Sequence, residues 1–187
     1  GFHFHVEMSN HKNAQLCFIF NEQIVEEGYK LELTIDKLTI EASTKSGHFY
    51  GLITFMQLFP NDIFSDTNSG KIISWDAPCV TIEDNPQYSW RGLLLDCSRH
   101  FFAISEVKKL LYWMSLHKLN IFHWHLTDDE GWRFESKKYP KLTEIGSILE
   151  KDGITSPHFY TQNEMKEIVS YAKNLCITVV PEIDMPG

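Results

Sequence analysis

The feature that most constrains the fold is the alternation of strand and helix patterns in the second half of the chain. Strand-like runs at 93–95, 120–126 and 177–180 are separated by two segments whose apolar residues recur at helical spacing. Largely apolar strands that are joined through helices are typical of right-handed βαβ units in a parallel sheet that is buried on both faces. The second half of the sequence therefore predicts an α/β fold.

Both predicted helices carry start signals. Ser105 is expected to cap the first helix, and Thr161-x-x-Glu164 is the pattern of a capping box for the second. In each helix the apolar residues at i, i+3, i+4 and i+7 form one face. These residues are Val107, Leu110, Leu111 and Met114 in the first helix, and Met165, Ile168, Val169 and Ala172 in the second.

The first half of the chain is organised differently. A buried strand is expected at 16–20, and alternating runs at 29–35 and 38–42 predict a hairpin around Asp36-Lys37. The segment 48–58 is apolar nearly all round, as in a helix that packs on a sheet, and Pro60 ends it. A polar loop is expected to follow. Because Asn85-Pro86 breaks local order, we expect a small α+β domain at 1–86 and an α/β domain at 87–187.

Composition excludes two classes of partner. The formal net charge is -8 and the pI is near 5.5, whereas nucleic acids and anionic membranes attract basic surfaces. The apolar runs are far shorter than the roughly 20 residues that span a bilayer, so we expect neither nucleic-acid binding nor a membrane span.

The four cysteines lie far apart in or beside apolar runs, which favours buried free thiols over a disulfide and excludes a CxxC metal site. They are Cys17, Cys79, Cys97 and Cys176.

Polar residues follow each of the three predicted parallel strands. In α/β folds the functional groups gather where the strands end, so these residues predict a pocket for a sugar or a metal ion. The first strand is followed by Asp96, Ser98, Arg99 and His100, the second carries or precedes His123, His125, Asp128, Asp129 and Glu130, and the third is followed by Glu182 and Asp184.

Several of these residues have two interpretations. His123 and His125 lie on one face of a strand, where they either bind a divalent metal or form a hydrogen-bonded pair that supports the strand end. The planar fork of Arg99 suits two adjacent hydroxyl groups or a carboxylate, and the alternative is a structural salt bridge to Asp96 or Glu182. Trp132 and Tyr139 either stack against a sugar ring or form a local hydrophobic core within a long loop.

Three stretches carry a more specific signal. They are WRGLLLDCSRHF at 90–101, KLNIFHWHLTDDEGWR at 118–133 and VPEIDMPG at 180–187. In sequence, order and spacing they resemble the successive signatures of glycoside hydrolase family 20, the β-N-acetylhexosaminidases. Residues 21–60 resemble the α+β domain that precedes the catalytic barrel in that family. The resemblance implies the start of a (β/α)8 TIM barrel preceded by a small α+β domain.

The resemblance also implies an activity: hydrolysis of terminal β-linked N-acetylglucosamine or N-acetylgalactosamine from glycans or chitooligosaccharides. Such enzymes retain configuration, because the acetamido group of the substrate attacks the anomeric carbon. Carried over by motif, Arg99 and Asp128 are expected to bind the sugar, and the residues expected to support them are Asp96, His125, Glu182 and Asp184. The catalytic Asp-Glu pair is expected beyond Gly187, so the segment alone is expected to be inactive.

No cofactor or metal is implied, and a secreted, periplasmic or lysosomal location is expected. Two alternatives remain open at this point. One is a metal-dependent barrel hydrolase that uses His123 and His125, and the other is a non-catalytic carbohydrate-binding fragment.

Overall fold

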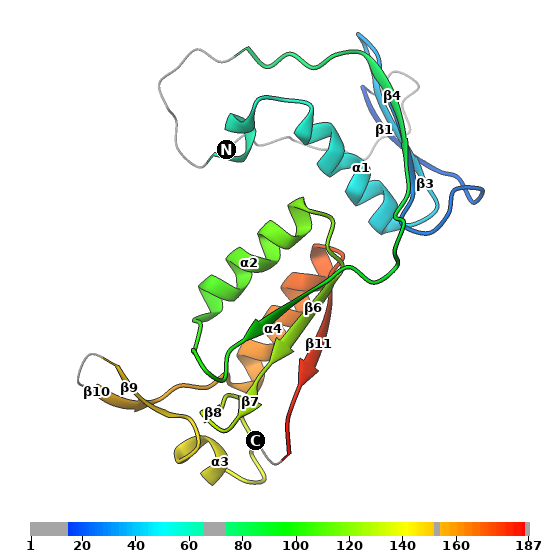
Figure 1. The fold of residues 1–187 in the computed structure, drawn as a ribbon. Coiled ribbons are helices and arrows are strands. Elements are labelled where there is room, and N and C mark those ends of the chain that lie inside the picture. Colours follow the sequence, from blue (N-terminus) through cyan, green and yellow to red (C-terminus); the bar gives the residue numbers. More distant parts are fainter. Residues whose placement is uncertain (1–14, 66–73, 152–153, 186–187) are drawn as a thin grey trace. The chain divides into compact units, whose positions relative to one another are not determined.

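The structure is a computed structural model that describes residues 15–65, 74–151 and 154–185. The chain divides into two compact units, 1–87 and 88–187 (Figure 1). None of the described helices is long and apolar enough to cross a membrane.

The first unit is a four-stranded sheet with one long helix. Its elements are β1 (Leu16–Phe20), β2 (Tyr29–Leu33), β3 (Leu38–Ala42), α1 (Lys45–Gln57), the short 3₁₀ helix η1 (Asn61–Phe64) and β4 (Val80–Asp84). The strand order is β1-β3-β2-β4, with β1 parallel to β3 and the other pairs antiparallel. The predicted hairpin is confirmed, because Leu31 of β2 lies opposite Ile40 of β3.

The helix α1 packs on this sheet over a small core of Leu31, Ile40, Ala42 and Tyr50, all buried. The approach is close at Gly47, where a Cβ atom would lie 2.3 Å from the carbonyl oxygen of Gly28, so a larger residue would force α1 away.

Three local predictions in this unit were wrong. The helix begins at Lys45 and not at residue 48, because the Thr44 side chain accepts a hydrogen bond from the Gly47 N–H and so caps it. Strand β2 ends at Leu33, which leaves Ile35 exposed in the turn. Strand β1 is not a buried run: Phe18 and Phe20 are exposed, because β1 is an edge strand.

The second unit is a three-stranded parallel sheet with two long helices, α2 and α4, and an excursion between β6 and α4. Its elements are β5 (Gly92–Asp96), α2 (Ile104–Leu116), β6 (Ile121–His125), β7 (Thr127–Asp128), β8 (Gly131–Trp132), α3 (Lys141–Glu144), β9 (Ile148–Lys151), β10 (Ile154–Pro157), α4 (Gln162–Asn174) and β11 (Thr178–Glu182). The sheet order is β11-β6-β5, while β7 pairs with β8 and β9 with β10 as antiparallel ribbons. The predicted parallel α/β sheet is confirmed.

The two helices cover one face of this sheet. Phe122 and Trp124 of β6 point to that face, where Val107 and Leu111 of α2 and Ile168 of α4 complete a fully buried core. The alternate residues of the strands, among them Leu94 and His123, lie on the opposite face. The expectation that β5 is buried on both faces was wrong, since Leu94 is 52% exposed at this sheet edge.

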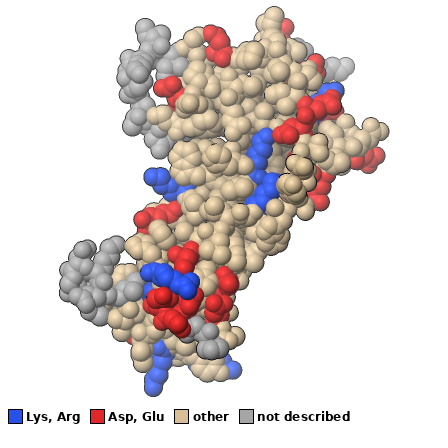
Figure 2. Space-filling view, viewed as in Figure 1, with Lys and Arg blue, Asp and Glu red and all other residues tan. Residues whose placement is uncertain are grey.

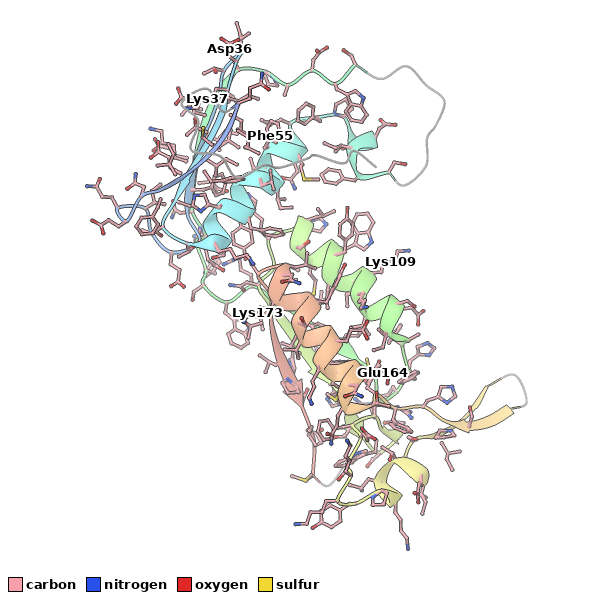
Figure 3. All side chains as sticks on the ribbon, turned by 180° about the vertical axis from the view of Figure 1, so that it is seen from behind. Asp36, Lys37, Phe55, Lys109, Glu164 and Lys173 are labelled. Carbon is pink, nitrogen blue, oxygen red and sulfur yellow. The ribbon has the colours of Figure 1, made fainter. Side chains whose placement is uncertain are left out.

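Of the two capping predictions, the one for α4 is confirmed and the one for α2 is wrong. The Thr161 side chain caps α4 by accepting a hydrogen bond from the Glu164 N–H, and the Glu164 side chain accepts one from the Thr161 N–H. These two bonds confirm the capping box. In α2 the cap position is Ala103, whose N–H donates to Glu106 at 2.7 Å, and Ser105 lies inside the helix, so its prediction was wrong. Figure 3 shows Glu164 and Lys173 at opposite ends of α4, where each charge complements the helix dipole.

Two burial predictions were also wrong in part. Val169 is 49% exposed although it lies beside the buried Ile168, so the apolar face of α4 is narrower than expected. The four cysteines are free, as predicted, but Cys97 alone among them is fully buried and Cys79 is exposed.

Candidate functional site

The register of the parallel sheet brings three predicted site residues into one row. Asp96 at the end of β5 lies opposite His125 at the end of β6, and His125 lies opposite Glu182 at the end of β11. Since they occupy equivalent places on adjacent strands, their side chains leave the sheet on the same face. The sequence could place each residue at a strand end, but only the pairing register makes them neighbours.

Asp96 shapes the turn that carries Arg99. Its Oδ1 accepts hydrogen bonds from the main-chain N–H groups of Ser98 (2.9 Å) and Arg99 (3.1 Å), which is the arrangement of an Asx turn. Its Oδ2 accepts from Arg99 Nη1 at 3.0 Å. Burial acts to raise the pKa of Asp96, but these hydrogen bonds to Arg99 outweigh it, so the pKa is lowered and the carboxylate stays ionised.

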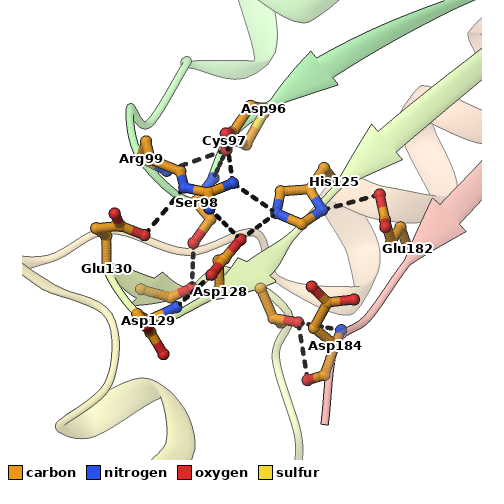
Figure 4. Close-up of polar contacts among 12 residues, drawn as sticks. Asp96, Cys97, Ser98, Arg99, His125, Asp128, Asp129, Glu130, Glu182 and Asp184 are labelled. Atoms are coloured by element: carbon orange, nitrogen blue, oxygen red, sulfur yellow. Dashed lines mark hydrogen bonds and ion pairs between the residues drawn. The ribbon is translucent and has the colours of Figure 1, made fainter. Parts of the chain in front are cut away.

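The guanidinium of Arg99 contacts three carboxylates (Figure 4). Besides Asp96, Asp128 Oδ2 lies 2.5 Å from Nη2 and Glu130 Oε2 lies 3.0 Å from Nε. The Arg99 side chain is nevertheless 50% exposed, whereas that of Asp128 is 19% exposed. Arg99 is therefore held in one orientation by its anionic neighbours while half of its side chain remains exposed.

The pair of histidines meets a single carboxylate. Glu182 Oε2 lies 2.7 Å from His123 Nε2 and 2.8 Å from His125 Nδ1. The second nitrogen of His125, Nε2, lies 3.1 Å from Asp128 Oδ2 and 3.3 Å from Arg99 Nη1. A carboxylate at each ring nitrogen favours the doubly protonated imidazolium, because both nitrogens then donate hydrogen bonds.

The acid–base properties of these residues follow from the contacts. Burial acts to lower the pKa of His125, but the hydrogen bonds to Glu182 and Asp128 outweigh it, so the pKa of His125 is raised. The hydrogen bond with His125 lowers the pKa of Glu182. The main-chain N–H of Asp129 is the first cause of the lowered pKa of Asp128, and His125 and Arg99 add to it.

The residues described so far form one connected group, which we call the Arg99 cluster: Asp96, Arg99, His123, His125, Asp128, Glu130 and Glu182. Asp184 joins this cluster through Thr127. The main-chain N–H of Asp184 donates to Thr127 Oγ1 at 2.7 Å, and ligand atoms of His125, Asp128 and Asp184 lie within 4.8 Å of one another. These three atoms could surround a cation. However, Asp128 already contacts the Arg99 guanidinium and the His125 ring, and two adjacent positive charges disfavour a metal ion there.

A pocket of about 700 Å³ lies beside this cluster, between the β7–β8 ribbon and α3. Asp128 and Asp129 line one part of it, and Trp132 and Tyr139 line another. The indole N–H of Trp132 donates to the Phe134 carbonyl at 2.6 Å, and Tyr139 is exposed. The two aromatic residues are thus pocket walls, with Trp132 anchored from behind.

The six residues expected to bind or support the sugar lie in or beside this cluster, whereas His100 is exposed and its ring contacts Phe102. Arg99, Asp128, Asp96 and His125 are in direct contact, and Glu182 joins through His125. The salt bridge expected between Arg99 and Asp96 is present, but Glu182 contacts the histidines and not Arg99. Figure 2 shows acidic and basic side chains gathered together over the carboxyl ends of the strands.

The sequence placed Glu130 among the polar residues at the strand ends, but it did not single out Thr127 or Arg133. Glu130 completes the set of carboxylates around Arg99, and Thr127 holds Asp184. Arg133 is fully buried behind the turn that carries Arg99. Neither the role of Thr127 nor the burial of Arg133 has a signal in the sequence, because a charged residue in a polar loop is ordinarily expected at the surface.

These features define a class: an α/β protein with a polar, arginine-centred site at the carboxyl ends of parallel strands. Residues 88–187 match the family model for the glycosyl hydrolase family 20 catalytic domain, and residues 3–85 match that for glycosyl hydrolase family 20, domain 2. The chain belongs to glycosyl hydrolase family 20.

Named relatives agree with this assignment. The chain is 43% identical over 163 residues to a beta-hexosaminidase of Porphyromonas gingivalis, covering 87% of this chain and 21% of the relative. It is 37% identical over 185 residues to a beta-hexosaminidase of Vibrio furnissii, covering 94% of this chain and 29% of the relative. The chain thus spans less than a third of the length of either protein.

Solved structures show the same fold. A mutant Streptomyces plicatus beta-hexosaminidase in complex with the product GlcNAc matches with a TM-score of 0.88 and 37% identity, covering 98% of this chain and 36% of that one. A Vibrio harveyi exo beta-N-acetylglucosaminidase in complex with N-acetylglucosamine matches with a TM-score of 0.81 and 37% identity, covering 92% of this chain and 28% of that one.

Proposed function

We propose that the full-length protein containing this chain hydrolyses terminal, non-reducing β-linked N-acetylhexosamine residues from glycans or chitooligosaccharides. The single observation that carries the proposal is the Arg99 cluster at the strand ends of a family 20 catalytic domain. The names of the relatives and the bound GlcNAc in two similar structures support this substrate class.

The proposal extends the architecture as well. The three parallel strands and their crossover helices are the first part of a (β/α)8 barrel, whose active site lies at the carboxyl ends of its strands. The row of Asp96, His125 and Glu182 lies at that end of the sheet. The polar cluster therefore forms one side of the sugar pocket.

Within this pocket Arg99 and Asp128 are the proposed sugar-binding residues. A guanidinium has five N–H donors in a planar fork, so Arg99 can donate to two adjacent sugar hydroxyls while its carboxylate neighbours hold it in place. Asp128 is ionised and can accept a hydrogen bond from a hydroxyl. Asp96, His125, Glu182 and Asp184 support these two side chains and set their charge.

The proposed reaction is retaining and assisted by the substrate, whose acetamido oxygen attacks the anomeric carbon. The residues of this chain bind and orient the sugar, and the acid–base pair for the reaction belongs to another part of the full-length protein. A metal-dependent reaction that uses His123 and His125 is not favoured, because Glu182 binds both rings.

The test uses purified full-length protein and two chromogenic substrates. We expect release of the aryl alcohol from an aryl N-acetyl-β-glucosaminide, but not from the aryl β-glucoside that carries a hydroxyl in place of the acetamido group. Treatment with a chelator should leave the rate unchanged. Equal cleavage of both substrates, or loss of activity with the chelator, would contradict the proposal.

A further inference from the structure

Arg133 is a charged residue with no exposed surface. All five of its N–H groups are directed at main-chain carbonyl oxygens. Nε donates to Cys97 at 3.2 Å, Nη1 donates to Ser147 and His158 at 2.9 and 3.0 Å, and Nη2 donates to Ser98 and Glu130 at 2.9 and 3.4 Å. The donor capacity of the guanidinium is thus fully used by the backbone.

The five carbonyls belong to segments that are distant in sequence. Two of them, at Cys97 and Ser98, immediately precede Arg99, and a third belongs to Glu130, whose carboxylate contacts Arg99 Nε. The remaining two are in the excursion between β6 and α4. Arg133 therefore connects the turn that carries Arg99 to the turn that carries Asp128 and Glu130.

A second bond reinforces this connection, since Ser98 Oγ donates to the Gly131 carbonyl at 2.8 Å. Space around the guanidinium is also limited. A Cβ atom on Gly131 would lie 2.2 Å from Arg133 Nη2 and 2.4 Å from Cζ. Any side chain at position 131 would therefore displace the guanidinium from its carbonyls.

A buried charge is unfavourable unless hydrogen bonds compensate for its lost hydration. The five hydrogen bonds to carbonyl oxygens provide this compensation for Arg133. Burial is also the first cause of the lowered pKa of Arg133. Losing the guanidinium would remove one donor from each of the five carbonyls, of which that of Ser147 also accepts a hydrogen bond from the His158 N–H, and the two turns would lose their common anchor.

We propose that Arg133 is a positioning residue, which fixes the turns at 97–99 and 128–131 against each other and so sets where the Arg99 fork meets the sugar. This inference rests on the proposed function for its kinetic consequences. Arg133 acts through Arg99 and does not touch the substrate.

The kinetic test compares Arg133→Met and Arg133→Lys with wild type in the full-length protein. A methionine fills part of the space but donates nothing, and a lysine keeps the charge but cannot reach carbonyls on both sides. Because a misplacement of about 1 Å can cost about 100-fold in rate, we expect kcat/KM for the aryl N-acetyl-β-glucosaminide to fall about 10- to 100-fold.

Arg91 provides a matched control. Its guanidinium also donates to main-chain carbonyls, at Lys118 (2.9 Å) and Tyr88 (2.6 Å), but it lies before β5, at the end of the sheet opposite the site. Arg91→Met should therefore lower the melting temperature and leave kcat/KM within about twofold of wild type, because the two carbonyls that it binds lie at the other end of the sheet from the site.

A double-mutant cycle separates positioning from a general structural role. If Arg133 acts through Arg99, Arg133→Met should have little further effect on kcat/KM in the Arg99→Lys background. Fully additive effects, or kinetics of folded Arg133→Met within about twofold of wild type, would overturn the inference. If Arg133→Met does not fold, Gly131→Ala applies the same test, since its Cβ displaces the guanidinium and should lower kcat/KM in the same way.

Hydrogen exchange keeps the inference distinct from the proposed function. In folded Arg133→Met, amides at 97–100 and 129–132 should exchange faster than in wild type, while those of β2 and β3 stay unchanged. If the wild-type protein does not cleave the substrate, the proposed function fails, and exchange at the two turns alone decides on Arg133. Unchanged exchange there would refute the positioning role.

Discussion

At the residue scale, the site depends on opposite charges held at short range. Arg99 has three carboxylates around it, and His125 has one carboxylate at each ring nitrogen. Exposed ion pairs contribute little to stability, so the ion pairs of the half-exposed Arg99 are expected to add little to the free energy of folding.

The first prediction concerns Arg99→Lys in the full-length protein. Lysine is a flexible point charge and cannot donate to two adjacent hydroxyls in one plane. Losing a charged hydrogen bond costs roughly 1.5–3 kcal/mol, so kcat/KM should fall about 10- to 150-fold. The melting temperature should change little. A lowered melting temperature with unchanged kinetics would instead mean that Arg99 serves only to join Asp96, Asp128 and Glu130.

The second prediction concerns the pH dependence of stability. The pKa of His125 is raised above its unfolded value of about 6.5, so its contribution is fully present below that pH and is lost as the pH rises through the folded pKa. The pKa values of Glu182 and Asp128 are lowered, so their contributions are present above unfolded values of about 4 and are lost as the pH falls.

The cluster should therefore stabilise the fold most between about pH 4.5 and 6.5. Denaturant unfolding of wild type and His125→Gln at several pH values tests this. The difference in the free energy of unfolding should be larger at pH 6 than at pH 9. A constant difference for His125→Gln would contradict the proposed imidazolium.

At the element scale, local sequence signals gave the helices but not all of their ends. The Thr161 and Glu164 pair defines the start of α4, since it satisfies main-chain donors from both directions. Ser105 carries the same kind of signal, yet α2 begins at Ile104 because Glu106 bonds the Ala103 N–H from within the helix. A short polar side chain near a helix start is therefore an ambiguous signal.

The third prediction uses this contrast. Thr161→Ala removes the side chain that accepts from the Glu164 N–H, and it should lower the free energy of unfolding by about 1 kcal/mol. Ser105→Ala removes a hydroxyl from an exposed position inside α2, and it should be neutral or slightly stabilising, because alanine favours helix. Equal losses in urea unfolding would show that Ser105 is the cap after all.

At the scale of the whole molecule, the parallel sheet has two edges. In the order β11-β6-β5 both outer strands pair on one side within the described residues, and Leu94 is 52% exposed on the face opposite the helices. Exposed strand edges with apolar residues promote association. In the proposed barrel, further strands would cover this edge and this face.

The fourth prediction concerns a protein truncated to residues 1–187. It should self-associate in sedimentation velocity experiments, because its sheet edges and Leu94 are open. Leu94→Lys should reduce that association, while Ile35→Lys, in an exposed turn of the first unit, should not. A truncated protein that is monomeric at high concentration would show that these edges are protected.

The sequence by itself determined the parallel α/β pattern, the hairpin, the capping box of α4 and the family motifs. These depend on residues close in the chain, where periodicity and turn chemistry act directly. It also placed Asp96, His125 and Glu182 at strand ends. It could not decide that these three share a row, that Glu182 binds both histidines, or that Glu130 completes the Arg99 cluster.

Tertiary structure decided those points, because strand register and the path of the excursion after β6 bring together residues that are far apart in sequence. It also decided the burial of Arg133, a charge that any composition-based argument places on the surface. Five carbonyls that converge on one guanidinium make this burial tolerable, and such convergence exists only in the folded chain.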